Sequence, residues 1–234
     1  MAGRAACPTF GGYGSEGGRS YGRKVSRARI ENFPSKGRRL PFQGGTKVVS
    51  TGIAIALAAG IAARWQPFPV QFTRHAMGQT VAISLDGGKV RKTFAGKMVI
   101  RDRFGTCASV CADVRGPVSR GQVFQVRPRP SSKVGGRVAL AGNIVARHLW
   151  EAQTPDQCAA LQLAVWEATE DGGERADFYS GRFQARASGA VMALAANYYA
   201  AVDEPREALH LAATSGGQSQ LTAPQITGPP VDPP

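Results

Sequence analysis

Two residues far apart along the chain, a cysteine and a glutamine, have types that could do chemistry together. Cys111 lies in the apolar segment VCADV, and Gln162 lies in the middle of the apolar segment AALQLAVWEATED. A buried amide without hydrogen bonds costs on the order of a few kcal/mol, so this glutamine either finds backbone partners or reacts. A thiol that attacks a carboxamide displaces ammonia and leaves a thioester, which requires fixed proximity and a polarised carbonyl.

The two segments resemble the signature motifs of the thioester domains of bacterial surface and exported proteins. In that family a strand motif of hydrophobic, Cys, hydrophobic, Asp precedes a helix motif Leu-Gln-hydrophobic-Ala-hydrophobic-Trp-Glu, matched here by VCADV and LQLAVWEA. AISLDGG and TFAGKMVI are similar to the family's opening strands, so the resemblance covers about residues 70–202. The chain departs from the family pattern at Val110, where an aromatic residue or leucine is usual.

The resemblance implies a thioester cross-link between the Cys111 thiol and the Gln162 amide. Such a bond is a single-use electrophile that captures an amine-bearing surface protein, or another nucleophilic ligand, and is not an enzyme's catalytic site. Trp166, one helical turn from Gln162, could cover the bond or simply be a core residue. Asp113 could polarise the site through a hydrogen bond, or be a solvated carboxylate at a strand end. Glu167 and Glu170 are expected on a solvated helix face.

Two further cysteines leave other interpretations open. We expect a disulfide between Cys107 and Cys158 beside the thioester, whereas a disulfide that included Cys111 would abolish it. The chain would then be a disulfide-stabilised, non-covalent extracellular binding or matrix protein. The alternative from another class is a cysteine-dependent hydrolase with Cys111 as nucleophile and His148 as base. No cofactor is expected, and the absence of a second ligand pair at zinc spacing argues against a metal.

The positive charge of the chain is concentrated near its N-terminus. The 234 residues carry a net charge of +13, and the first 47 hold ten basic residues against two acidic ones. Residues 1–46 are rich in Gly, Arg and Ser, a composition that predicts disorder. An RNA-binding arm of this composition is conceivable, but the segment that follows makes a nucleic-acid partner improbable.

That following segment has the pattern of an export signal. Residues 48–63, VVSTGIAIALAAGIAA, are uncharged, lie between Lys47 and Arg64, and are too few for a comfortable membrane span of roughly 20 residues. We expect residues 47–63 to be a signal peptide cleaved near Ala63, with an uncleaved anchor as the alternative. The chain would then be extracellular or on the cell surface, with a role in adhesion, and would touch a membrane only through this segment if it stays uncleaved.

The elements that must position the pair fall into two halves, which predicts an α+β fold: an antiparallel β-barrel or sandwich half packed against a small helical half. Three helices are expected. The first covers residues 136–152, the second begins at a capping box formed by Thr154, Pro155 and Gln157, and the third covers 183–201. Residues 64–214 would form the thioester-like domain, and Ser215–Pro234 a Pro- and Gly-rich tail. The expected strands are 79–85, 89–95, 97–103, 109–114, 122–127 and 208–214.

Overall fold

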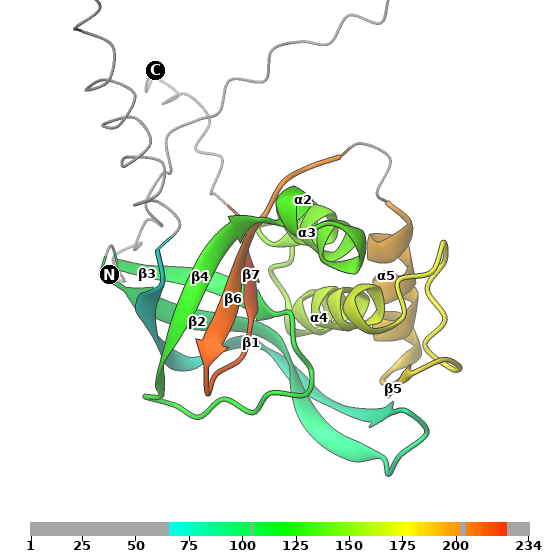
Figure 1. The fold of residues 1–234 in the computed structure, drawn as a ribbon. Coiled ribbons are helices and arrows are strands. Elements are labelled where there is room, and N and C mark those ends of the chain that lie inside the picture. The colour runs from blue at the N-terminus through cyan, green and yellow to red at the C-terminus, as the bar shows by residue number, and fades with distance from the viewer. Residues whose placement is uncertain (1–65, 104, 202–204, 224–234) are drawn as a thin grey trace, which may run out of the picture.

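The computed structural model describes residues 66–103, 105–201 and 205–223 (Figure 1). The predicted basic region at 1–46 and the predicted signal segment at 47–63 lie outside these residues. So do residues 224–234 of the predicted tail.

In the described part of the chain, six antiparallel strands close into a β-barrel and a seventh extends it (Figure 1). The strand order is β2-β3-β7-β6-β4-β1-β5, and pairing of β1 with β2 closes the ring. The long first strand makes this possible, because it pairs with β4 near its start, with β2 along its middle and with β5 at its end. The strands are β1 (Phe68–Leu85), β2 (Arg91–Asp102), β3 (Gly105–Cys111), β4 (Val123–Pro130), β5 (Phe183–Arg186), β6 (Leu209–Ser215) and β7 (Gln220–Thr222).

Two glycines allow β1 and β2 to approach closely where they bend. Gly78 and Gly96 are opposite each other in the register and have φ of 156° and 152°. A Cβ on Gly78 would lie 2.1 Å from the Ala95 carbonyl oxygen, and one on Gly96 would lie 2.2 Å from that of Met77. Any side chain here would force the strands apart, so the bend depends on glycine at both positions.

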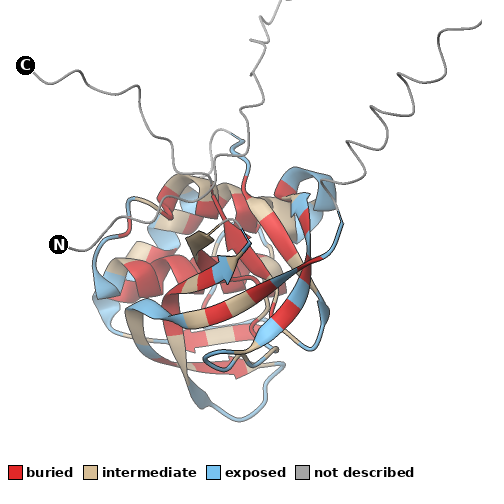
Figure 2. Ribbon diagram, turned by 90° about the vertical axis from the view of Figure 1, so that its left-hand side faces the viewer, coloured by how far each residue is buried: buried red, intermediate tan, exposed pale blue. Residues whose placement is uncertain are grey.

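Four helices of the described chain gather on one side of the barrel (Figure 1). The central one, α4, packs against two helices and against β1, β2 and β3, and 12 of its 16 residues are buried. Figure 2 shows that buried positions run through both the helices and the strands. The helices are α2 (Ser131–Val134), α3 (Gly136–His148), α4 (Pro155–Glu170) and α5 (Gly189–Ala200).

The start of α4 is fixed by its own sequence. The Thr154 hydroxyl accepts a hydrogen bond from the Gln157 N–H at 3.2 Å, and the Gln157 side-chain oxygen accepts one from the Thr154 N–H at 3.0 Å. Pro155 occupies the first turn, where backbone N–H groups have no acceptor within the helix, so its lack of an N–H costs no hydrogen bond. The predicted capping box is therefore confirmed, and it fixes the residue at which α4 begins.

The predicted α+β fold, with a barrel half and a helical half, is confirmed. Several element boundaries differ from the predictions; β1, for example, begins at Phe68, eleven residues before the expected strand 79–85. The expected strands 89–95 and 97–103 are the single strand β2, and the expected helix 183–201 begins with strand β5 and becomes helical only at Gly189. The expected tail is wrong for residues 215–222, because β6 extends to Ser215 and β7 lies between β3 and β6 in the barrel, paired with both.

Two apolar clusters form the core, and α4 contributes to both. One fills the barrel and includes Leu163 and Trp166 of α4; the other lies on the helical side and includes Leu161 and Val165 of α4. Gln162 therefore lies on the boundary between the two clusters, where α4 meets the end of β3.

Candidate functional site

Cys111 is the last residue of β3, at a place where the ladder between β2 and β3 has already ended. The two strands pair from Asp102–Gly105 to Met98–Ser109 and no further. Continuing the register would put Gly96 opposite Cys111, but the ladder with β3 stops at Met98–Ser109, while β2 stays paired with β1 through Gly96. On its other edge β3 is paired with β7, where Cys111 lies opposite Gln220.

The side chain of Gln162 bonds to the Cys111 backbone at this end of the ladder. The Cys111 N–H donates to Gln162 Oε1 at 2.9 Å, and Gln162 Nε2 donates to the Cys111 carbonyl oxygen at 2.7 Å. The two residues are 2% and 1% exposed. The buried amide thus has backbone partners for both its polar atoms, and its carbonyl is polarised by an N–H of the residue that carries the thiol.

The Cys111 thiol is enclosed by polar groups of two other elements. Its Sγ donates to the Asp113 carbonyl oxygen at 2.8 Å. The Trp166 indole N–H lies beside the sulfur and has no oxygen or nitrogen acceptor among the described residues. Burial raises the pKa of the thiol well above its usual range, against the opposing effects of Trp166 and the Asp113 backbone. The thiol is therefore protonated near neutral pH.

Asp113 acts at the site through its backbone. Its carboxylate accepts from the Arg115 N–H at 2.9 Å, which forms a local turn just after β3. The carbonyl oxygen of Asp113, by contrast, contacts the thiol. Val114, which follows, is 5% exposed and belongs to the same apolar cluster as Cys111 and Trp166. Residues 112–116, which we call the covering segment, follow directly after Cys111 and place the Asp113 carbonyl oxygen against the sulfur.

A chain of buried amides holds the covering segment on the barrel side. Gln218 Nε2 donates to the carbonyl oxygens of Asp113 at 2.9 Å and of Gly116 at 2.6 Å. Gln220 Nε2 in turn donates to the Gln218 side-chain oxygen at 3.2 Å, and Ser109 Oγ donates to Gln220 Oε1 at 3.1 Å. These glutamines were not predicted as site residues, because they lie in the stretch assigned to the tail and no local pattern marks them.

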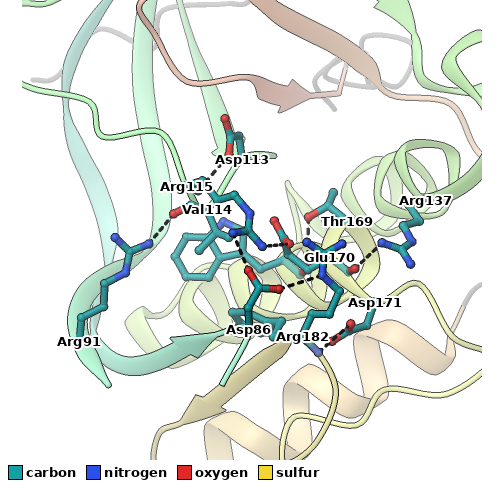
Figure 3. Close-up of polar contacts among 12 residues, drawn as sticks. Asp86, Arg91, Asp113, Val114, Arg115, Arg137, Thr169, Glu170, Asp171 and Arg182 are labelled. Carbon is teal, nitrogen blue, oxygen red and sulfur yellow. Dashed lines mark hydrogen bonds and ion pairs between the residues drawn. The ribbon is translucent and has the colours of Figure 1, made fainter. Parts of the chain in front are cut away.

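A cluster of ion pairs lies at the helix side of the covering segment (Figure 3). Arg115 is 2.8 Å from Asp86 Oδ2 and 2.9 Å from Glu170 Oε2, and so joins the segment to the β1–β2 turn and to the end of α4. Arg182 Nε is 2.9 Å from the other oxygen of Asp86. The hydrogen bonds from Arg115 and Arg182 lower the pKa of the Asp86 carboxyl, which stays ionised at neutral pH.

The prediction that Glu167 and Glu170 form a solvated face is wrong. Glu167 is 2% exposed and Glu170 9% exposed, because the loop after α4 returns across the end of this helix. Glu167 Oε1 accepts the Asp177 N–H at 2.9 Å. Burial raises the pKa of the Glu167 carboxyl to about 7.

The structure does not form the predicted Cys107–Cys158 disulfide. Cys158 is a free thiol whose Sγ lies 3.4 Å from the Ala152 carbonyl oxygen. It packs in the helix-side cluster with Val110, whereas Cys107 packs against the barrel cluster. Side chains alternate along a strand, so Cys107 and Val110 point to opposite faces of β3. That alternation separates Cys107 from Cys158.

His148 is also placed away from the pair. Its Nδ1 is 2.9 Å from Glu151 Oε2 and its ring stacks on Tyr198 at 4.3 Å between centroids. Among the described residues, Cys111 is hydrogen-bonded to Asp113, Gln162 and Trp166, and no hydrogen bond joins it to His148. The arrangement required of a Cys–His hydrolase is not assembled here.

Comparison of the chain with protein-family models, curated proteins and solved structures found no match. Within residues 66–103, 105–201 and 205–223, no three His, Cys, Asp or Glu side chains are grouped as metal ligands. None of the helices in these ranges has the length and apolar character to cross a membrane. The functional argument therefore rests on the Cys111–Gln162 site itself.

Proposed function

We propose that Cys111 and Gln162 condense into an internal thioester, and that the chain uses this bond to capture an amine-bearing partner covalently. The observation that carries the proposal is the pair of hydrogen bonds by which the Gln162 carboxamide is held on the backbone of Cys111. These bonds fix the electrophile against the residue that supplies the nucleophile, 51 positions away in the sequence. Fixed proximity is one requirement of this reaction, and a polarised carbonyl is the other.

The first step exchanges ammonia for the thiol. Cys111 Sγ attacks the Gln162 carbonyl carbon while the Cys111 N–H stabilises the charge that develops on Oε1. The C–S bond forms, the bond from carbon to Nε2 breaks, and the thiol proton leaves with that nitrogen as ammonia. The protonated thiol needs no separate base, because the departing nitrogen takes its proton.

The second step is capture. An amine of the partner, such as a lysine side chain, attacks the same Gln162 carbonyl carbon, forms an amide and returns Cys111 as a free thiol. The bond is used once, so the chain is a covalent binding protein and not a catalyst. Burial of both residues protects the thioester from hydrolysis before the partner arrives.

The proposed setting is outside the cell. Residues 47–63, with basic residues before them and an uncharged apolar run, support export, and a covalent bond to a partner surface suits adhesion under mechanical load. The partner is expected to be an amine-bearing surface protein or another nucleophilic ligand. The thiols of Cys111 and Cys158, which are free, give no support to a disulfide that includes Cys111.

Methylamine labelling tests the proposal. The wild-type chain should gain one methylamine at Gln162 and expose one new thiol, and Cys111→Ala or Gln162→Ala should do neither. Cys158→Ala serves as the matched control, because it removes another buried thiol. This variant should still be labelled at Gln162. Labelling of Gln162→Ala, or no labelling of a fresh wild-type chain, would overturn the proposal.

A further inference from the structure

The proposed thioester lies beneath the covering segment, so an incoming amine must pass it. Cys111 and Gln162 are almost fully buried, and the Asp113 carbonyl and the Val114 side chain pack on the site. A small amine can enter through brief fluctuations of a packed segment, whereas a lysine on a polypeptide needs the segment to move aside. The segment's attachments therefore determine which amines react.

We propose that Arg115 is the residue that controls this access, by holding the covering segment closed through its ion pairs with Asp86 and Glu170. The inference rests on the proposed thioester and adds to it the element that selects nucleophiles by size. Figure 3 shows Arg115 reaching from the segment to both carboxylates.

The two sides of the segment are attached differently. On the barrel side, Gln218 is 8% exposed and its amide donates to the carbonyl oxygens of Asp113 and Gly116, while Gln220, 1% exposed, donates in turn to the Gln218 side chain. Breaking those bonds would leave buried polar groups unpaired, which is costly. This side is the fixed one.

On the helix side, the attachments are partly open to solvent. The side chains of Arg115 and Asp86 are 42% and 47% exposed and that of Glu170 is 11% exposed. Arg91, which donates to the Val114 carbonyl oxygen at 2.7 Å, is exposed. Exposed ion pairs contribute little individually, and water replaces their partners when they open. The segment should therefore open on the arginine side while Gln218 keeps its other end in place.

Each attachment also joins a different element. Asp86 lies in the turn after β1, Glu170 is the last residue of α4, and Arg115 follows β3. One side chain thus ties the segment to the barrel and to the helix that carries Gln162. A partner that displaces Arg115 would release the segment from both at once.

The test compares two amines on the full chain. The small probe is methylamine, and the large probe is a short N-acetylated peptide with one lysine. Arg115→Gln should raise the rate of peptide addition roughly three- to tenfold and change the methylamine rate less than about twofold, since weak exposed pairs are being removed. Arg115→Lys keeps a charge that can pair with one carboxylate, so it should give an intermediate peptide rate.

Two further variants separate access from a general structural effect. Glu170→Gln removes a partner of Arg115 and should act in the same direction as Arg115→Gln, which keeps the test valid if that variant fails to fold. Arg182→Gln is the matched control, because Arg182 also pairs with Asp86 but makes no hydrogen bond to the covering segment among the described residues. It should leave the ratio of the two rates unchanged.

The outcomes distinguish this inference from the function on which it rests. A wild-type chain that adds neither amine overturns the thioester and the access control together. A wild-type chain that adds methylamine, with equal rate ratios in wild type, Arg115→Gln and Glu170→Gln, overturns the role of Arg115 alone. An equal acceleration of both amines, or the same effect in Arg182→Gln, also overturns it, because the cause would be general loosening.

Discussion

Glu167 allows the burial of α4 to be tested through the pH dependence of stability. Its carboxyl lies inside the protein, with one oxygen on the Asp177 N–H and the other without a hydrogen-bond partner among the described residues. Burial raises its pKa from the usual 4.5 to about 7, and the carboxylates of Asp171 and Asp177 add to the effect. The folded chain therefore binds this proton more tightly than the unfolded chain does.

The sign of the effect follows from proton linkage. Between about pH 4.5 and 7 the folded state holds more protons at Glu167 than the unfolded state, so the free energy of unfolding falls as the pH rises. Each pKa unit corresponds to about 1.4 kcal/mol, so complete deprotonation of Glu167 costs the folded chain on the order of 3 kcal/mol. The cost is absent at about pH 4 and fully present at about pH 8.

Glu167→Gln should remove this cost while keeping an oxygen that can accept the Asp177 N–H. We expect the variant to match the wild type near pH 4 to within about 1 kcal/mol and to be more stable by up to about 3 kcal/mol near pH 8. Urea unfolding of both proteins across this range measures the difference. Glu170→Gln, three residues further along α4, is the control and should retain the wild-type fall in stability. If the difference in the free energy of unfolding between the wild type and Glu167→Gln does not change with pH, the reasoning is refuted.

Two further substitutions test the supports of α4 by urea unfolding. Thr154→Ala removes the side chain that caps the helix and should lower the free energy of unfolding by about 1 kcal/mol. Thr154→Ser keeps the hydroxyl and should lower it clearly less. Equal losses in the two variants would contradict the capping box. Tyr199→Phe removes the hydroxyl that donates to the Gly173 carbonyl oxygen at 2.6 Å and should lower the free energy of unfolding by about 1 kcal/mol. Tyr179→Phe, at a residue that is 74% exposed, should leave it almost unchanged. A similar loss in both variants would contradict the role of the Tyr199 hydrogen bond.

Local signals predicted the parts of the fold that are determined locally. The capping box at Thr154 placed the start of α4, and the alternation of apolar residues located most strands of the barrel. For these elements, the information lay within a few residues of the element concerned. The approach of Gln162 to Cys111 was expected because VCADV and LQLAVWEA resemble the thioester-domain motifs, whereas the residues alone indicated only that a glutamine inside an apolar helix needs partners.

Features that depend on distant segments could not be predicted in this way. β7 has three residues and no apolar alternation of its own, and it is a strand only because β3 and β6 lie on either side of it. Gln218 reaches the covering segment, and Gln220 reaches Gln218, only because this strand is paired there. Glu167 was assigned to a solvated face because its sequence neighbours do not reveal that the loop containing Asp177 covers it. The same applies to Arg115, whose partners come from two other elements.

The mass of the intact, freshly purified chain tests the central claim most directly. If Cys111 and Gln162 have condensed, the reduced protein weighs one ammonia less than its sequence requires, and Cys111→Ala and Gln162→Ala both have the masses expected for uncondensed chains. Cys158→Ala, which removes the other buried free thiol, should keep the deficit. A wild-type mass equal to that of the sequence, measured in amine-free buffer before hydrolysis can occur, would contradict the thioester.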